Sequence, residues 1–544
     1  MTNEDIADTL KFTAKLMELH GENAFKVGSY NNASFKLDKY EKELSTLSQQ
    51  EIEAIQGVGK SIATKIHELI ATGQLTELNQ LIEKTPAGVI EILGIKGIGP
   101  KKGRMLWLEA GIESIGELYY ACNENRLVDI KGFGEKTQQL IKQAIEFLLA
   151  SKNKFHYATA EFAGNELIKS IKEKYPEALI SFCGALRRKC EVIEKIEIHL
   201  SPSPSPKERG SDFIVPLVGK TANGIPYEIF ICERKNFYHQ LFLLTGSAEH
   251  IAQINTKGLE ECSSEEEIYL KNNLNYIEPE LRETAATKQV GERISLIELK
   301  DLKGIFHVHT KYSDGKHSLE EMAKHCKELG YEYLGISDHS QTAVYAKGLK
   351  PERVFEQFAE IDKLNQELAP FKIFKGIESD ILGDGSLDYE EEILKQFDFV
   401  IASVHQNLKM NEEKATARLL KAIENPYTTI LGHMTGRLLL SREGYPLDTK
   451  KIIDACAANN VIIELNAHPY RLDIDWRWIP YALEKGVMIS INPDAHSKEG
   501  YGDMYYGVCA ARKGALIADM TFNAKHLNEV AEVLTKKKLL MTNC

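Results

Sequence analysis

The alternation of apolar and polar residues divides the chain into three regions. Up to about residue 150, apolar residues recur at the spacing of amphipathic helices, as at Ile6, Leu10, Leu16 and Met17. From about residue 155 to 295, helix-like and strand-like segments alternate. From about residue 302 to the end, short apolar runs are each followed by an amphipathic helix. This last pattern predicts a parallel sheet or barrel of βα units.

Five apolar runs in the last region are predicted to be strands. They are Tyr333–Ser337, Phe399–Val404, Thr429–Leu431, Val461–Leu465 and Val487–Ile491. Acidic and imidazole side chains repeatedly follow or end such runs. Because the carboxyl ends of the strands in a βα barrel meet at one mouth, where active sites are found, we expect these side chains to converge.

These side chains form a candidate metal centre. The candidate ligands are His307, His309, Asp314, His339, Glu378, His405, His433, Asp494 and His496. Period-two alternation in a strand points the His307 and His309 imidazoles to the same side. Nitrogen and carboxylate ligands without thiolates suit Zn²⁺, Mn²⁺ or Fe²⁺, and nine ligands suit two or three ions. A lone histidine is more often structural, as we expect for His317, His325 and His526, whereas the role of His468 stays open.

This spacing closely resembles the PHP (polymerase and histidinol phosphatase) domain over about residues 302–544. The resemblance implies a distorted (β/α)7 barrel that hydrolyses phosphoesters at three divalent metal ions. It implies that the ions have these ligands: His307, His309, Glu378 and Asp494 for one, Glu378 and His405 for a second, and Asp314, His339, His433 and His496 for a third. Glu378, Asp494 and His405 are then the expected catalytic residues. Asn466 and Arg471 are candidate substrate contacts on the barrel rim.

A turn with two glycines around one apolar residue occurs three times in the helical region. The copies are Gln56-Gly-Val-Gly-Lys60, Lys96-Gly-Ile-Gly-Pro100 and Lys131-Gly-Phe-Gly-Glu135. Such a turn leaves amides free at the start of the next helix, where the positive helix end suits a phosphate oxygen. One copy alone is as well explained by a simple joint between helices, but three copies with nearby lysines favour binding of the phosphate backbone. The pattern resembles the helix-hairpin-helix motif, and the candidate DNA-binding residues are Gly57, Gly59, Lys60, Gly97, Gly99, Lys101, Lys102, Gly132, Gly134 and Lys136.

A PHP domain preceded by these hairpins looks like the C-terminal half of a bacterial family X DNA polymerase. Gly184-Ala-Leu-Arg-Arg188 resembles the family's Gly-Ser-x-Arg-Arg nucleotide-binding turn, and Thr245-Gly-Ser247 resembles its segment before the thumb. The resemblance covers essentially the whole chain and implies a multidomain α+β protein with a polymerase-beta-like nucleotidyltransferase palm and thumb. The implied domains are 1–80 (N-terminal helical, DNA-binding), 81–152 (fingers-like helical), 153–240 (palm-like), 241–300 (thumb-like) and 301–544 (PHP).

The polymerase site of this framework is altered. The family polymerises with three aspartates that bind two Mg²⁺ ions, and those positions fall here on Lys195, Glu197 and Glu228. The serine of the nucleotide-binding turn is Ala185, three residues before Arg188. A lysine replaces a metal-binding anion by a cation, and Lys195 could pair with Glu197 or Glu228 instead. Two-metal phosphoryl transfer needs that negative cluster, so we expect nucleotide addition to be lost or severely reduced and Mg²⁺ binding there to be in doubt.

Charge and composition limit the partners and the compartment. The formal net charge is −12, whereas phosphate binding usually leaves a basic footprint, so we expect DNA contacts to be local, weak and salt-sensitive. No apolar run reaches the roughly 18 residues of a transmembrane helix, and the acidic start lacks the plan of a secretory signal. Nine scattered cysteines without a CxxC pair fit a reducing compartment. We expect a cytoplasmic monomer without membrane contact.

The leading interpretation is a DNA repair enzyme that acts mainly as a metal-dependent phosphodiesterase. It would be a 3′–5′ exonuclease or DNA-end processing enzyme that acts on gapped, nicked or 3′-terminal DNA. Three alternatives remain open: a gap-filling polymerase that tolerates the altered acids, a non-catalytic DNA-binding scaffold, and a small-molecule phosphatase. The last has no use for three hairpins, and a PHP site without metal would favour the scaffold.

Overall fold

The structure is a computed structural model that describes residues 1–544 except 124–126, 128–129, 131, 152, 203–216, 223, 284–293, 441–442 and 542–544. The chain forms two compact units, Met1–Lys152 and Asn153–Cys544. Within the described residues, no helix is both long and apolar enough to cross a membrane.

The described part of the first unit is helical. Its helices are α1 (Asn3–His20), α2 (Ala24–Leu37), α3 (Gln49–Glu53), α4 (Lys60–Thr72), α5 (Thr76–Glu83), α6 (Ala87–Ile92), α7 (Pro100–Arg104), α8 (Ile115–Asn123) and α9 (Glu135–Ser151). Helix α1 begins at a capping box, in which the Thr2 side chain accepts from the Asp5 amide and the Asp5 carboxylate accepts from the Thr2 amide. Ile6, Leu10, Leu16 and Met17 are fully buried, because their helical spacing places them on the face of α1 that packs into the core.

The second unit begins with a four-stranded sheet in the order β2-β4-β6-β5. Its strands are β2 (Leu179–Phe182), β4 (Ile196–Ser201), β5 (Leu217–Lys220) and β6 (Pro226–Ile231), and β1 (Phe155–His156) pairs with β3 (Val192–Ile193) beside it. The helices of this part are α10 (Tyr157–Lys174), α11 (Gly184–Arg187), α12 (Phe237–Thr245), α13 (Ala248–Ile251) and α14 (Glu265–Leu270). Strands β4 and β6 are parallel and in a register that places Glu197 opposite Glu228.

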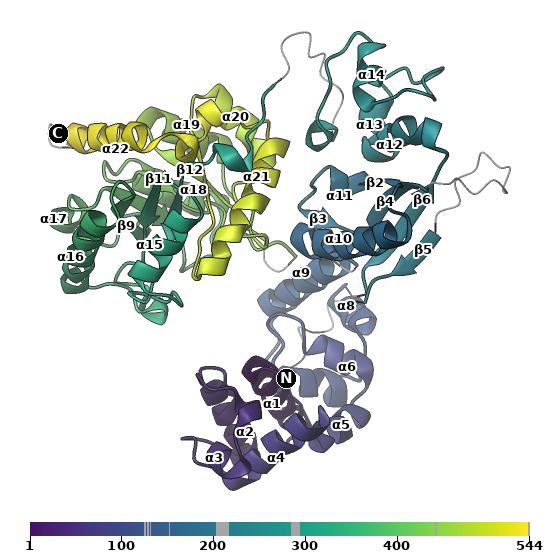
Figure 1. The fold of residues 1–544 in the computed structure, drawn as a ribbon. Coiled ribbons are helices and arrows are strands. Elements are labelled where there is room, and N and C mark those ends of the chain that lie inside the picture. Colours follow the sequence, from purple (N-terminus) through teal and green to yellow (C-terminus); the bar gives the residue numbers. More distant parts are fainter. Residues whose placement is uncertain are drawn as a thin grey trace. The chain divides into compact units, whose positions relative to one another are not determined.

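The remainder of the second unit is a nearly closed parallel barrel of seven strands (Figure 1). The strands are β7 (Gly304–Val308), β8 (Tyr333–Ile336), β9 (Lys372–Asp380), β10 (Phe399–Ser403), β11 (Ile430–Leu431), β12 (Ile462–Asn466) and β13 (Ile489–Asn492). They are neighbours in sequence order, and a parallel bridge between Val308 and Ala495 joins the two edges. The surrounding helices are α15 (Leu319–Glu328), α16 (Pro351–Glu367), α17 (Glu391–Leu394), α18 (Glu412–Ile423), α19 (Thr449–Asn459), α20 (Ile479–Glu484), α21 (Met504–Lys513) and α22 (Leu527–Met541).

The barrel strands are almost entirely buried, because helices cover their outer face and side chains fill the interior. The interior away from the mouth is aromatic. The Phe306 ring lies with its centroid 5.0 Å from that of Phe399 and 5.2 Å from that of Phe522. The five strands expected from the apolar runs are present, each within two residues of its expected ends. Their carboxyl ends point to one mouth, where the polar residues gather.

Candidate functional site

Glu378 on β9 lies at the centre of the barrel mouth and faces five imidazoles. Its Oε1 atom is 3.1 Å from Nε2 of each of three histidines: His307, His405 and His433. Its Oε2 atom is 2.9 Å from His339 Nδ1 and 3.6 Å from His309 Nε2. The carboxylate therefore has a group of nitrogen ligands on each side, the arrangement of a residue that bridges two ions.

The donor spacing fits divalent ions. Zn–N bonds of about 2.0–2.1 Å in a tetrahedral site place neighbouring donor atoms about 3.3 Å apart, close to the separations around Glu378. Two buried atoms that face the cluster, His307 Nε2 and Glu378 Oε2, make no well-aligned hydrogen bond among the described residues. Leaving such atoms unsatisfied costs about 1–3 kcal/mol each, and bound ions would provide the partners.

A second group of ligand atoms lies nearer the barrel rim. It consists of His309, Asp314, His339 and His496, whose ligand atoms all lie within 4.8 Å of one another. His496 Nε2 is 3.4 Å from Asp314 Oδ1, and His339 Nε2 is 3.7 Å from Asp314 Oδ2. Asp314 and His496 are the most exposed of the nine candidate ligands, so this group is the one that solvent reaches most easily.

The grouping of possible ligand atoms differs from the expected one at His433. The resemblance places His433 with Asp314, His339 and His496, but the structure groups it with His307 and Asp494 and places it against Glu378. The reason is the strand order. His433 follows β11, which lies between β10 and β12, far around the barrel from the Asp314 loop that follows β7.

Three hydrogen bonds hold the imidazoles in orientation. His307 Nδ1 donates to Glu464 on β12, and His405 Nδ1 donates to Asp380 at the end of β9, each over 2.5 Å. His496 Nδ1 lies 2.9 Å from the Asp494 carbonyl oxygen. In each ring Nε2 is left facing the cluster, the usual way in which a supporting acceptor fixes a metal-binding histidine.

Sequence reasoning assigned no role to Asp380 or Glu464, although a signal was present. Both are acids in strands that are otherwise apolar, and Asp380 stands two residues after Glu378, on the same face of β9. Glu464 is fully buried and also accepts from the His433 amide. Buried acids of this kind are kept where they have specific partners.

The charges of the cluster set its protonation. Burial raises the pKa of Glu378, but the neighbouring imidazoles, His405 foremost, outweigh burial and hold it well below the ordinary range. Burial, followed by the charges of His496 and His339, lowers the pKa of His309 to about 3. The central carboxylate is thus ionised and His309 is neutral, the forms that bind a cation. Burial lowers the pKa of His405 and of His496, but the neighbouring carboxylates outweigh burial and raise these pKa values to about 10 and about 9, so a bound cation would displace protons from both rings.

The two expected substrate contacts are placed differently. Arg471 lies at the mouth, with its Nε atom 3.9 Å from Asp494 Oδ2 and a fifth of its side chain exposed. Asn466 is not on the rim: it is fully buried, and its amide group donates to both Glu464 and Asp494 at 3.1 Å. The expected place on the rim is therefore wrong for Asn466, because at the end of β12 its donors contact the two buried acids; its contact with a substrate stays a prediction. His468 lies beside this group, and the Tyr470 amide donates to its Nδ1 atom.

The altered polymerase positions form an ion-paired cluster on the palm-like sheet. Lys195 Nζ lies 2.6 Å from Glu228 Oε2 and 3.2 Å from Glu197 Oε1. Burial lowers the pKa of Lys195, but its bonds to Glu228 and Glu197 outweigh burial and raise it above the ordinary value. The lysine ammonium thus occupies the position between the two carboxylates that a cation would need.

The turn between β2 and β4 also makes contacts with other parts of the protein. The Gly184 backbone has φ +59°, and a Cβ there would meet Glu197 Oε2, so glycine is required. Arg188, three residues after Ala185, donates to the Thr245 carbonyl oxygen over 2.6 Å and contacts Glu283 at 3.1 Å. Arg187 forms an ion pair with the buried Glu265. Both arginines of the turn therefore have internal partners.

The three glycine turns share one geometry. The first glycine of each is left-handed, with φ of 94° at Gly57, 93° at Gly97 and 89° at Gly132. The apolar residue between the glycines is buried in each copy, and its amide donates to the carbonyl oxygen three residues earlier: Val58 to Ile55, Ile98 to Ile95 and Phe133 to Ile130. The first glycine is required by its backbone conformation.

The second glycine of each turn is not explained by the fold. Gly59 and Gly99 have φ of −85° and −86°, which any residue adopts, and they cap α4 and α7 without a side-chain hydrogen bond. Among the described residues, no atom lies within 4 Å of a Cβ placed on Gly59, Gly99 or Gly134. Space and free amides at a helix start suit the close approach of a phosphate group. Lys60, Lys101 and Lys136 are exposed nearby, and Lys102 lies over the Phe133 ring.

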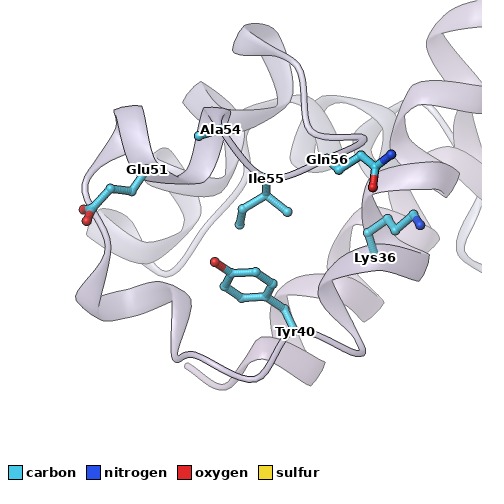
Figure 2. A pocket seen from close by; sticks show the side chains of 6 residues that line it. All are labelled: Lys36, Tyr40, Glu51, Ala54, Ile55 and Gln56. Atoms are coloured by element: carbon cyan, nitrogen blue, oxygen red, sulfur yellow. The ribbon is translucent and has the colours of Figure 1, made fainter.

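A pocket of about 390 Å³ borders the first turn (Figure 2). It is lined by Lys36, Tyr40, Glu51, Ala54, Ile55 and Gln56. A Cβ on Gly57 would lie 3.4 Å from Lys36 Cγ, so Lys36 adds a cation beside the turn. The sequence pattern did not reveal this lysine, because it belongs to α2 and reaches the turn only through the fold.

Comparisons with known proteins agree with this arrangement. Residues 1–75 match the helix-hairpin-helix domain family, residues 89–146 the SAM-like helix-hairpin-helix tandem family, and residues 306–468 the PHP domain family. The DNA polymerase/3′-5′ exonuclease PolX of Bacillus subtilis (strain 168) is 32% identical over 98% of this chain and 100% of its own length.

Shorter relatives match the barrel region. A probable phosphatase of Thermoanaerobacter sp. (strain X514) is 27% identical over 43% of this chain and 94% of its own length. A probable phosphatase of Acetivibrio thermocellus is 30% identical over 35% of this chain and 78% of its own length. The helix-hairpin-helix domains indicate DNA binding, and the buried clusters of His, Asp and Glu are able to hold metal ions. The chain belongs to the family X DNA polymerases that carry helix-hairpin-helix domains and a C-terminal PHP domain.

Proposed function

We propose that this protein is a metal-dependent phosphodiesterase that shortens DNA from 3′ ends, and that its polymerase-like part adds nucleotides weakly or not at all. The contrast between two acidic clusters carries the proposal. Glu378 is surrounded by imidazoles, and its Oε2 atom makes no well-aligned hydrogen bond among the described residues, whereas Glu197 and Glu228 already have Lys195 as their counterion. The first cluster offers nitrogen and carboxylate ligands to divalent ions, whereas Lys195 offsets part of the negative charge of the second.

The ions would be held by the nine candidate ligands, with Glu378, Asp494 and His405 closest to the chemistry. Divalent ions such as Zn²⁺, Mn²⁺ or Fe²⁺ polarise a phosphoester and activate water when bound in such a site. The chain itself contributes Arg471, a cation for a substrate phosphate beside Asp494. Asn466, Glu464 and Asp380 orient the ligands, and the glycine turns hold the DNA backbone.

We propose that each of the five domains given above has its own function. Residues 1–80 and 81–152 would bind gapped or nicked DNA, residues 153–240 and 241–300 would act as a scaffold, and residues 301–544 would hydrolyse the phosphodiester. Backbone amides rather than many cations would contact the DNA, which is consistent with a net charge of −12.

Digestion of gapped DNA in the presence of Mn²⁺ tests this function. With the label on the 5′ end of the primer, a 3′–5′ exonuclease gives a ladder of progressively shorter primers. The double variant His307→Ala/His309→Ala should lose this activity and lose bound metal, because both imidazoles face Glu378.

The matched control is His325→Ala/His526→Ala. His325 and His526 lie outside the cluster, near Glu328 and Glu332, and their removal should change neither activity nor metal content. Release of phosphate from small esters with no digestion of DNA would instead favour a phosphatase. A native protein that binds no metal would favour a DNA-binding scaffold.

A further inference from the structure

The loop that follows β12 connects the metal cluster to the palm-like part of the same unit. It follows Asn466, the last residue of β12, which contacts Asp494, and it includes His468, Tyr470 and Arg471. Arg471 approaches Asp494 to 3.9 Å, and the neighbouring Tyr470 is a large aromatic residue with 49% of its surface exposed. A cation that suits a phosphate thus lies beside Asp494, and the residue before it in the chain carries an exposed aromatic ring.

The palm-like part holds this loop at its middle. His156, in β1, lies with its ring centroid 4.2 Å from that of Tyr470. The His156 Nε2 atom is also 3.0 Å from the Leu439 carbonyl oxygen, and the Leu439 amide donates to the Tyr470 carbonyl oxygen over 2.7 Å. These three contacts fix the ring and the backbone of Tyr470 together.

The palm-like part also holds the end of the loop. Glu191, just before β3, accepts from the Trp476 indole over 3.0 Å and from Arg477 over 2.8 Å. Residues 155–193 thus contact the loop at two places, while Arg437 of the barrel donates to the Arg471 carbonyl oxygen between them. A ring held in this way keeps its orientation before any substrate arrives, which lowers the ordering cost of binding.

A rigid, half-exposed aromatic ring beside a phosphate-binding cation has the chemistry that recognises a nucleotide. Bases stack on aromatic side chains with little sequence preference, and loss of one such stack weakens binding about 5- to 150-fold. Consecutive Cα atoms lie about 3.8 Å apart. This spacing allows Arg471 to contact the phosphate of a nucleotide while Tyr470 contacts its base.

We propose that Tyr470 is the platform on which the 3′-terminal base of the DNA substrate stacks, and that His156 of the palm-like part positions this ring. The inference rests on the phosphodiesterase function proposed above and specifies its substrate as a base-bearing DNA end. It also gives the palm-like part a role that does not depend on nucleotide addition: it forms one wall of the PHP substrate site.

The test compares two oligonucleotides that differ only in the terminal nucleotide, one with a 3′-terminal thymine base and one with an abasic 3′-terminal sugar. Tyr470→Ala should raise the KM for the base-bearing oligonucleotide about tenfold and leave kcat almost unchanged. It should leave the KM for the abasic oligonucleotide unaltered, because there is no base to stack. Tyr470→Phe keeps the ring and should behave as the native protein.

Two further variants complete the design. His156→Ala should raise the same KM by a smaller factor, since the ring remains but loses its support. Tyr481→Ala is the matched control, because Tyr481 lies on α20 and its hydroxyl bonds to Asp454 on α19. An equal rise in KM for both oligonucleotides, or no rise with Tyr470→Ala, would overturn the proposal.

The two proposals fail in different ways. If the native protein hydrolyses neither oligonucleotide, the phosphodiesterase function is wrong. The platform is then tested by the fluorescence anisotropy of labelled trinucleotides with and without the 3′-terminal base. A base-dependent loss of affinity in Tyr470→Ala would support the platform, and equal affinities of the native protein and Tyr470→Ala would contradict it.

Discussion

Lys195 forms ion pairs with Glu197 and Glu228 across two parallel strands. Removing its ammonium leaves two like charges opposite each other, which destabilises a sheet by up to about 1 kcal/mol. We therefore expect Lys195→Ala to lower the melting temperature by about 1–3 °C and Mg²⁺ to restore it, because the freed carboxylates become a cation site. Differential scanning fluorimetry with and without Mg²⁺ checks this, with the native protein as reference. A melting temperature unaffected by the substitution or by Mg²⁺ would show that Lys195 is not the counterion.

Asp380 supports the candidate metal centre through His405. It accepts from His405 Nδ1 over 2.5 Å and so directs Nε2 toward Glu378. Asp380→Asn keeps the shape but weakens this bond, and we expect a loss of metal affinity of about 10- to 100-fold. Titration of metal-free protein with Mn²⁺ measures the effect. Asp384→Asn is the control, because Asp384 is exposed and contacts Lys421 away from the mouth; an equal loss in both variants would argue against a specific role for Asp380.

At the residue scale, the sequence predicted the residues of the site where acidic and imidazole side chains repeat at strand ends. From the pattern alone, His307, Glu378 and Asp494 were predicted to converge at one mouth of the barrel. The pattern misplaced Asn466, because a position on a strand next to the mouth does not reveal whether the side chain reaches solvent or an acid beneath the ligands. It did not find His156, since no local pattern connects a residue of the second region with a loop more than 300 residues later.

At the scale of elements, the glycine turns allow a test that separates stability from DNA binding. Serine is a better helix cap than glycine, and its hydroxyl accepts from the amides that a phosphate would use. Gly59→Ser should therefore keep or raise the stability of the first unit while lowering DNA affinity several-fold. Gly57→Ala, with φ of 94° at that position, should instead cost about 1–2 kcal/mol of stability. Electrophoretic mobility shifts at low salt and thermal unfolding measure the two effects; unchanged DNA affinity in Gly59→Ser would remove this turn from the interface.

The type and order of elements were more predictable than their mutual contacts. The apolar runs gave the barrel strands within two residues, because a strand buried on both faces is continuously apolar. The grouping of His433 depended on the order of strands around the barrel, which the runs do not contain. The Lys36 side chain beside the first turn depended in the same way on the packing of α2.

At the scale of the whole molecule, Glu283 joins the polymerase-like part to the barrel. It lies 2.7 Å from the buried Lys513 on α21 and 3.1 Å from Arg188. Burial raises the pKa of Glu283, but Lys513 and its other partners outweigh burial and lower it to about 2. Because the pKa is lower in the folded state, the stabilisation is present above about pH 4.5 and is lost as the pH falls toward 2.

Glu283→Gln should therefore lower the free energy of unfolding of the second unit by about 2–3 kcal/mol at pH 7, since Lys513 stays buried without its counterion. The difference from the native protein should shrink as the pH falls to 3. Urea unfolding at both pH values checks this, with Glu424→Gln at an exposed helix end as the control. A difference that is constant with pH would contradict the ion-pair explanation.

We propose that the barrel hydrolyses DNA and that the palm-like sheet adds nucleotides weakly or not at all. A single reaction compares hydrolysis with nucleotide addition. It contains native protein, a 5′-labelled primer on gapped DNA, Mg²⁺, Mn²⁺ and all four deoxynucleoside triphosphates. We predict that the primer only becomes shorter and that His307→Ala/His309→Ala leaves its length unchanged. Template-directed lengthening of the primer to the end of the gap would contradict the account.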